Sequence, residues 1–237
     1  MQFAMTVASA TPHTFSKFDQ ELARLDTLLV AMAHSGREQL GRALSALERG
    51  DSSQAAAIRE ADAAIDALEQ DVQSLVIHML TTRQPVADDL RHVLAALKIA
   101  TDLERIGDHG KNIAKRLTLM SGATNPLTGR VVSLGRTVER AFDKLIVAYE
   151  QRDVAAAHEI WAQDGEIDQE HLHVSTALSQ QMERDPTTIG SGVQLHFIAK
   201  SIERTGDRLT NIAEQIAFYL EGVRTAGERP RIDPSAD

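Results

Sequence analysis

Residues 103–108 read Leu-Glu-Arg-Ile-Gly-Asp, and residues 202–207 read Ile-Glu-Arg-Thr-Gly-Asp. Asn-Ile-Ala follows each stretch at the same distance, at residues 112–114 and 211–213. Within each copy the Glu and the Asp are four residues apart, which puts both carboxylates on one face of a helix, with the Asn one turn further on. Carboxylates held close together repel one another unless a cation or a basic partner compensates them. The repeat therefore predicts a duplicated helical fold with a duplicated acidic face.

Helical periodicity extends outward from both copies. Apolar residues recur with the spacing of a helix, and no alternating strand pattern is convincing. The first half predicts one helix from about residue 18 to 49, a second that ends near residue 83, and a third over about 87–120. Gly50 suits the position after a helix, Asp51 suits a helix cap, and Pro85 disfavours helix at the residue before it. Residues 121–126, Ser-Gly-Ala-Thr-Asn-Pro, are the best linker candidate.

The second half repeats this plan. Three further helices are expected, which end near residue 152, at the Arg-Asp-Pro at 184–186, and at about residue 222. The halves align without gaps from Glu48 with Glu150 to Asp66 with Asp168, and a three-residue deletion then brings Glu104 onto Glu203. We predict an all-α fold of two tandem, repeat-related three-helix bundles with six long helices. The expected boundaries are 1–122 for the first bundle, 126–222 for the second and 223–237 for a disordered tail.

The repeat exposes two further acidic pairs. Asp62 and Asp66 lie four residues apart on the second helix, and Asp164 and Asp168 lie four apart on the fifth. These acids continue the apolar stripe of their helices instead of lying opposite it. A glycine precedes the Asp of both Glu-Arg-x-Gly-Asp runs, which suggests that bulk is excluded there so that helices or ions can approach closely.

These acidic faces predict two metal sites, one in each half. Oxygen ligands without thiolates favour hard or borderline cations such as Mg, Mn, Fe or Ca. His171 takes the place that Glu69 has in the first half, which would tilt the second site toward iron, manganese or zinc. The competing interpretation is a set of ordinary ion pairs in which Arg105, Arg204 and Lys200 neutralise the acids. The candidate ligands are Asp62, Asp66, Glu69, Glu104, Asp108, Asn112, Asp164, Asp168, His171, Glu203, Asp207 and Asn211.

Composition argues against several classes of function. A net charge of −9 over 237 residues disfavours a broad nucleic-acid footprint, and the lack of Cys removes disulfides, thiolate catalysis and zinc fingers. No run reaches the eighteen or so apolar residues of a membrane span, and the first sixteen residues carry no Lys or Arg, so they make a poor signal peptide. No Walker motif, dinucleotide fingerprint or Ser/His/Asp arrangement is recognisable. We therefore expect a soluble, cytoplasmic protein.

At these motifs the chain resembles the PhoU family, the accessory and regulatory proteins of high-affinity phosphate transport. The resemblance covers nearly the whole chain and rests on Arg-Gln-Pro at 83–85, Asp-Leu-Arg at 89–91, both Glu-Arg-x-Gly-Asp runs and Ile-Asp-Gln-Glu at 167–170. It implies two similar three-helix bundles and multinuclear metal clusters. The implied ligand pairs are Asp62/Asp66, Glu104/Asp108, Asp164/Asp168 and Glu203/Asp207, with Asn112 and Asn211 as additional ligands.

The resemblance further implies regulation instead of catalysis. Family members are negative regulators of phosphate-starvation signalling and modulate phosphate uptake, in contact with the ATPase subunit of the phosphate ABC transporter and a membrane sensor histidine kinase. We expect an adaptor that is not an enzyme, forms a homodimer and associates peripherally with membrane complexes. Two other classes stay open. One is a metal-dependent enzyme or iron-handling bundle that uses the carboxylates directly, and the other is a structural scaffold with ion-paired acids.

Overall fold

The computed structural model describes residues 17–120 and 125–223, and within those ranges all regular structure is helical. None of the described helices combines the length and the apolar character that crossing a membrane requires. The first sixteen residues, most of the expected linker and the expected tail beyond residue 223 lie outside the described residues. The helices are α1 (Lys17–Arg49), α2 (Ala55–Arg83), α3 (Ala87–Leu119), α4 (Thr128–Gln151), α5 (Val154–Ala162), α6 (Asp164–Arg184) and α7 (Ile189–Glu221), with 3-10 turns at Ser52–Gln54 and Pro186–Thr188.

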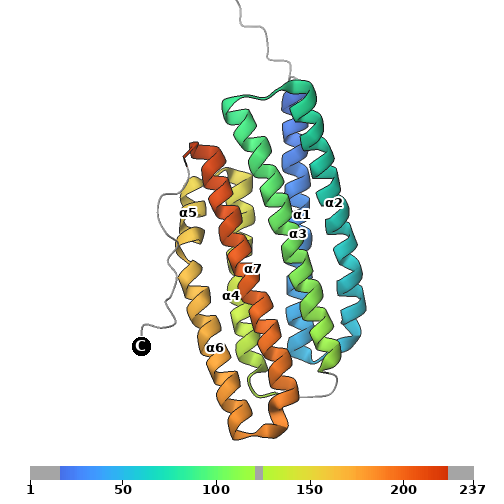
Figure 1. The fold of residues 1–237 in the computed structure, drawn as a ribbon, viewed down its shortest axis with the longest axis vertical. Coiled ribbons are helices and arrows are strands. Elements are labelled where there is room, and N and C mark those ends of the chain that lie inside the picture. The colour runs from blue at the N-terminus through green and yellow to red at the C-terminus, as the bar shows by residue number, and fades with distance from the viewer. Residues whose placement is uncertain (1–16, 121–124, 224–237) are drawn as a thin grey trace, which may run out of the picture.

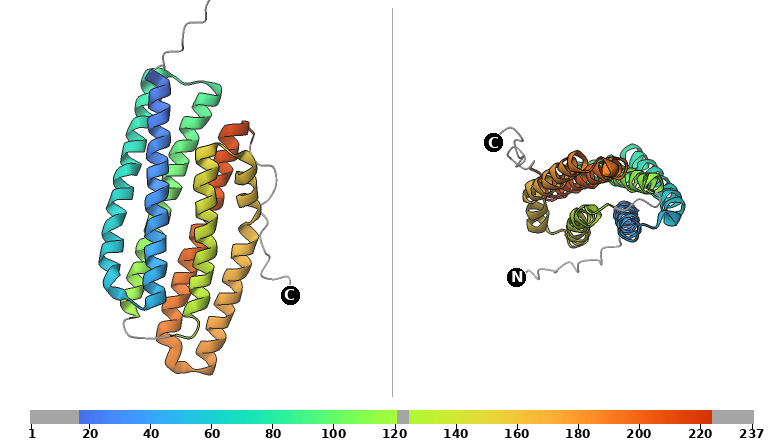
Figure 2. Two further views of the ribbon diagram at one scale, coloured as in Figure 1. Left: turned by 180° about the vertical axis from the view of Figure 1, so that it is seen from behind. Right: turned by 90° about the horizontal axis from the view of Figure 1, so that it is seen from below.

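The predicted all-α fold of two tandem bundles is confirmed. Helices α1, α2 and α3 form one bundle, and α4, α7 and the α5–α6 pair form the other (Figure 1). The two bundles lie side by side, with α3 packed along α7 and α1 along α4 (Figure 2). One continuous apolar core runs through both halves. The acidic segments of α3 and α7 are therefore anchored by a shared core.

The helix ends follow the local chemistry of the sequence. Gly50 has a φ of +62° after α1, a conformation that glycine adopts without a steric penalty. The carboxylate of Asp51 accepts a hydrogen bond from the backbone N–H of Ser53 at 3.0 Å, so this residue caps a 3-10 turn and α2 begins only after that turn. Asp153 caps α5 in the equivalent place, through the backbone N–H of Ala156.

The six long helices of the prediction are present among the described residues, but the fifth is not continuous with the chain before it, because a short helix, α5, precedes α6. The predicted helix is interrupted at Gln163, where α5 ends. The backbone N–H of Gln163 donates hydrogen bonds to the carbonyl oxygens of Glu159 and Ile160. The first half has Ala63 where the second half has Gly165, and glycine costs about 1 kcal/mol relative to alanine inside a helix. The weaker helical preference at this point accounts for a break in the second half where α2 runs without one.

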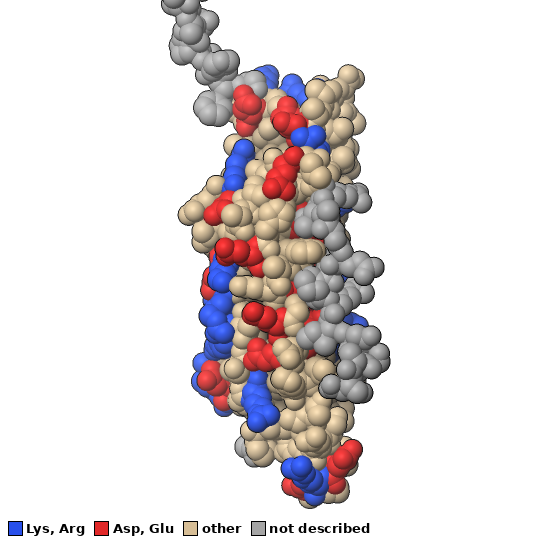
Figure 3. Space-filling model, turned by 90° about the vertical axis from the view of Figure 1, so that its left-hand side faces the viewer, with Lys and Arg blue, Asp and Glu red and all other residues tan. Residues whose placement is uncertain are grey.

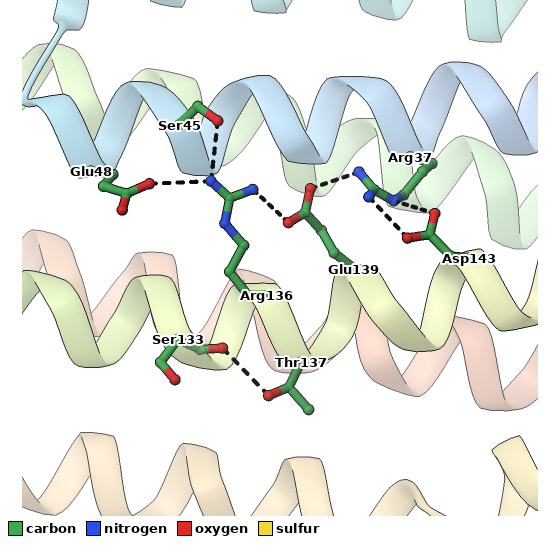
Figure 4. Close-up of polar contacts among 8 residues, drawn as sticks. All are labelled: Arg37, Ser45, Glu48, Ser133, Arg136, Thr137, Glu139 and Asp143. Atoms are coloured by element: carbon green, nitrogen blue, oxygen red, sulfur yellow. Dashed lines mark hydrogen bonds and ion pairs between the residues drawn. The ribbon is translucent and has the colours of Figure 1, made fainter.

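An ion-pair chain joins α1 to α4 across the two bundles (Figure 4). Glu139 lies at its centre with 4% of its surface exposed. Its two carboxylate oxygens accept hydrogen bonds from Arg37 and Arg136, each at 2.6 Å. Arg37 also pairs with Asp143, and Arg136 also pairs with Glu48. The chain thus compensates a buried carboxylate with two guanidinium groups from different halves.

Candidate metal centre

The pairing of α6 with α7 brings three carboxylates of the second half together. Asp168 comes from α6, and Glu203 and Asp207 come from consecutive turns of α7. One oxygen of each lies within 4.8 Å of the others, close enough for all three to bind a single cation. Figure 3, which faces the side of the molecule where α5 and α6 lie, shows acidic side chains gathered along this face. Of the predicted ligands, these three form the most compact group.

Glu203 provides the strongest indication that the group suits a cation. The residue is 9% exposed, and its Oε1 accepts a hydrogen bond from Lys200 Nζ at 2.6 Å. Its Oε2 is buried and has no hydrogen-bond partner among the described residues. A buried acceptor without a partner costs about 1–3 kcal/mol, and more when it is charged. A metal ion would compensate this oxygen, so the residues present fit a cation.

The electrostatics of Asp207 agree with an under-compensated site. Burial raises the pKa of Asp207, and the negative charges of Glu203, Asp164 and Asp168 raise it further, to about 6. Lys200 opposes this shift. A carboxylate surrounded by like charges in a partly buried site gains from a neighbouring cation.

Asp164 and His171 lie beside this group. Thr210 Oγ1 donates a hydrogen bond to Asp164 Oδ1 at 2.8 Å, and Asp164 is 4% exposed. His171 Nε2 lies 3.2 Å from Ser175 Oγ. Burial lowers the pKa of His171, which favours the neutral imidazole that metals bind, although the nearby Glu203 charge opposes the shift. Asp164 and His171 both belong to α6, and from there they are placed to support the three carboxylates.

The first half has Lys111 at the position where the second half has Thr210. Lys111 Nζ pairs with Asp62 Oδ2 and, at 2.9 Å, with Asp108 Oδ1. Arg105 Nη1 pairs with Asp108 Oδ2 at 3.3 Å, and Gln39 Nε2 lies 3.5 Å from Asp62 Oδ1. All four oxygens of these two carboxylates thus face a donor. Hydrogen bonds to Asp62 and Asp108 hold the pKa of Lys111 well above its usual range.

Glu104 lies near three other acids of the first half. Burial raises the pKa of Glu104, and the charges of Asp108, Glu69 and Asp66 raise it further, whereas Arg105 opposes them. Asn112 is exposed on α3, and Asn211 is half-buried on α7. The contacts of Arg105 and Lys200 agree with the ion-pair interpretation. Sequence reasoning missed Lys111 and Gln39, although comparison of Lys111 with its repeat equivalent Thr210 would have been a signal.

The two glycines inside the acidic motifs permit close helix packing, as predicted. A Cβ on Gly107 would lie 2.8 Å from Asp62 Oδ1 and 3.0 Å from Ile65 Cδ1. A Cβ on Gly206 would lie 3.1 Å from Ile167 Cγ2. The glycine therefore lets α2 approach α3 in the first half and lets α6 approach α7 in the second half.

Comparison with known proteins points to one family. The profile of the PhoU domain matches residues 29–117 and 131–216. The chain is 35% identical over 225 residues to a phosphate-specific transport system accessory protein PhoU homolog of Caulobacter vibrioides, which covers 94% of this chain and 98% of that protein. It is 33% identical over 211 residues to the accessory protein PhoU of Edwardsiella tarda, which covers 89% and 87%.

Solved structures give the same result. The crystal structure of PhoU from Pseudomonas aeruginosa superposes with a TM-score of 0.84 at 29% identity, over 87% of this chain and 100% of that one. The phosphate transport system regulatory protein PhoU of Streptococcus pneumoniae superposes with a TM-score of 0.79 at 27% identity, over 88% and 99%. The similarity therefore extends to both halves of the fold.

Proposed function

The chain belongs to the PhoU family of phosphate-specific transport accessory proteins, and we propose that it is a regulatory adaptor that modulates high-affinity phosphate uptake and represses the phosphate-starvation two-component response. The observation that carries this proposal is the match of the PhoU profile to both halves. Its relatives are accessory proteins of phosphate transport, and we propose that this chain likewise acts as a regulator and not as an enzyme. We therefore assign the acidic cluster to metal binding within an adaptor.

The proposed metal ligands are Asp168, Glu203 and Asp207, with His171 beside them. Support comes from the 4.8 Å grouping and from the buried Glu203 Oε2, which lacks a partner among the described residues. The carboxylate donors suit Fe, Mn or Mg, and the neighbouring imidazole also allows Zn. A bound ion would supply the positive charge that joins α6 to α7. The metal is assigned a structural or regulatory role and no catalytic step.

The proposed partners are the ATPase subunit of the phosphate ABC transporter and a membrane sensor histidine kinase, and we further propose that the protein is a homodimer. Family membership supports an association with transport components. We place the protein in the cytoplasm, where it would join these membrane complexes from one side. Pull-down of purified transporter ATPase and of the kinase on the immobilised adaptor tests each contact separately.

Deletion of the gene in the bacterium that encodes it tests the regulatory role. We expect a phosphate-starvation reporter to stay active in phosphate-rich medium, because the restraint on the kinase is lost, and we expect the intact gene to restore repression. Normal repression in the deletion strain, without a second copy of the family, would contradict the proposal. Redox turnover or phosphatase activity of the purified metal-loaded protein would favour the enzyme class instead.

A further inference from the structure

Two positions beside the acidic faces differ between the repeats. The alignment of Glu104 with Glu203 places Lys111 opposite Thr210. The alignment of Glu48 with Glu150 likewise places Gln39 opposite Ala141. Both residues of the first half carry a donor on a long side chain, and both residues of the second half are small. The difference therefore concerns the charge and the volume beside the equivalent carboxylates of the two repeats.

The same carboxylate has different partners in the two halves. Asp62 meets the ammonium of Lys111 at one oxygen and the amide of Gln39 at the other. Its equivalent Asp164 accepts a hydrogen bond from the neutral hydroxyl of Thr210 at 2.8 Å. Lys111 also reaches Asp108 at 2.9 Å, so a single ammonium links α2 to α3. In the second half no such link is made by residue 210, because a threonine side chain is short and uncharged.

The space left by the smaller residues is present in the structure. A cavity of about 240 Å³ lies between α4, α5, α6 and α7. Ala141, Gly206 and Thr210 are among the residues that line it, together with Arg140 and Lys144. Thr210 follows Asp207 by three residues on α7, as Lys111 follows Asp108 by three residues on α3. A lysine at position 210 would therefore have both the room and the carboxylate, Asp164, that Lys111 uses in the first half.

A metal ion in the first half would have to compete with Lys111. It would use Asp66, Glu104 and Asp108, the repeat equivalents of Asp168, Glu203 and Asp207. Both carboxylate oxygens of Asp108 already face a donor, from Lys111 and from Arg105. If the ammonium stayed, it would lie beside a divalent cation in a half-buried site, and like charges in such a site repel strongly. In the second half, by contrast, Glu203 Oε2 is buried without a hydrogen-bond partner among the described residues.

We propose that Lys111 is a built-in cation that takes the place of a metal in the first half, so that metal binds in the second half alone. The statement that metal binds in the second half rests on the metal site proposed above. The role of Lys111 in the first half does not rest on it. This division of roles replaces the expectation of one metal site per half. It also makes the two halves respond differently to chelation. The ammonium of Lys111, which is part of the protein, holds α2 to α3. The contact between α6 and α7 depends instead on a bound metal ion.

The test exchanges the two residues in the full-length protein. Chelator-stripped wild type, Lys111→Thr and Thr210→Lys are titrated with Mn²⁺ alone, and bound metal is measured by calorimetry and by elemental analysis after gel filtration. We expect wild type to bind Mn²⁺ in one class of site. We expect Lys111→Thr to gain a second class of comparable stoichiometry and Thr210→Lys to lose the original one. Lys111→Arg, which keeps the charge, is the matched control and should gain nothing.

Asparagine and glutamine substitutions locate each class of site. Asp207→Asn should abolish the Mn²⁺ binding of wild type, and Glu104→Gln should leave it unchanged. In the Lys111→Thr background, Glu104→Gln should remove the gained class. The Glu104→Gln measurement in the wild-type background needs no change at position 111, so it tests the inference even if Lys111→Thr does not fold.

The outcomes separate this inference from the proposed second-half site. Loss of wild-type metal in Glu104→Gln would overturn the inference, as would a folded Lys111→Thr that gains no site. If wild type binds no Mn²⁺ and Lys111→Thr binds it, the role of Lys111 stands and the second-half site is wrong. Thermal unfolding provides a readout independent of stoichiometry, because Mn²⁺ should raise the melting temperature of Lys111→Thr by more than that of Lys111→Arg.

Discussion

Arg37 Nη1 on α1 donates a hydrogen bond to Glu139 Oε1 on α4 at 2.6 Å, and this contact crosses between the two repeats. Glu139 is 4% exposed, so its charge is removed from water and depends on Arg37 and Arg136 for compensation. The side-by-side position of the bundles, which sets the directions in which their outer faces point, therefore depends in part on one buried carboxylate (Figure 4).

Glu139→Gln should lower the free energy of unfolding by about 1–3 kcal/mol, because two guanidinium groups lose their shared acceptor in a half-buried site. Urea unfolding followed by circular dichroism measures this change. Glu48→Gln, at the exposed end of the same ion-pair chain, is the control and should change stability by no more than about 0.5 kcal/mol. Equal effects of the two substitutions would show that the buried position of Glu139 adds nothing.

Asp26 should make an acid-sensitive contribution to stability. Burial alone would raise its pKa, but hydrogen bonds from His92 and Tyr149, together with the charges of His92 and Arg152, hold the pKa below its usual value. A lowered folded-state pKa gives stability that is complete above the unfolded value of about 3.9 and is lost as pH falls through the folded value.

The measurement is the unfolding free energy of wild type and Asp26→Asn from pH 7 downward. Wild type should be the more stable at neutral pH, and its advantage should shrink below about pH 4. Asp71→Asn, an exposed substitution on α2, is the control and should show a small difference that does not follow this pattern. An advantage of wild type over Asp26→Asn that persists unchanged into acid would refute the assigned role of the carboxylate.

Asp207→Asn should have opposite effects with and without metal. In chelated protein at pH 7 it removes one of several clustered negative charges, so we expect stability to rise by roughly 1–2 kcal/mol after allowance for the partial exposure of the site. With Mn²⁺ at one hundred times its dissociation constant, wild type should gain about 2.7 kcal/mol and the variant much less.

Melting curves with chelator and with Mn²⁺ check this reversal. Glu183→Gln, an exposed change on the same α6 helix that carries Asp168, serves as the control and should follow wild type in both conditions. If Asp207→Asn is no more stable than wild type in the presence of chelator, the carboxylates of α6 and α7 do not repel one another in the apo protein.

Gly107→Ala should destabilise the first bundle. Its Cβ would approach Asp62 Oδ1 and Ile65 Cδ1 within 3.0 Å, and such overpacking costs about 1–3 kcal/mol, partly offset by the better helix propensity of alanine. Gly129→Ala in α4 meets nothing within 4 Å and should be neutral or stabilising by up to about 1 kcal/mol. Thermal unfolding of both variants separates packing from propensity, and a stable Gly107→Ala would mean that α2 can move away from α3.

The sequence alone determined the helices, the duplication and the acidic faces. These features depend on local periodicity, on turn residues such as Gly50 and Asp51, and on the four-residue spacing within each acidic pair. A residue's place on its own helix is fixed by the 3.6-residue turn, whatever the helix packs against. The close-packing role of Gly107 therefore followed from its place in the repeated motif. The break at Gln163 was missed, because it depends on a small difference in helix propensity.

Only the tertiary structure decided which side chains meet across helices. Lys111 and Asp62 are 49 residues apart in the chain, and Arg37 and Glu139 are 102 apart. Such pairs depend on the relative shift and rotation of packed helices, which the hydrophobic pattern restricts to a face but not to a single partner. From periodicity and spacing the two acidic faces are equivalent. The packing made them unequal. Lys111 bridges carboxylates of α2 and α3 on one face, whereas on the other face Lys200 pairs with Glu203 of its own helix and Glu203 Oε2 is buried without a donor among the described residues.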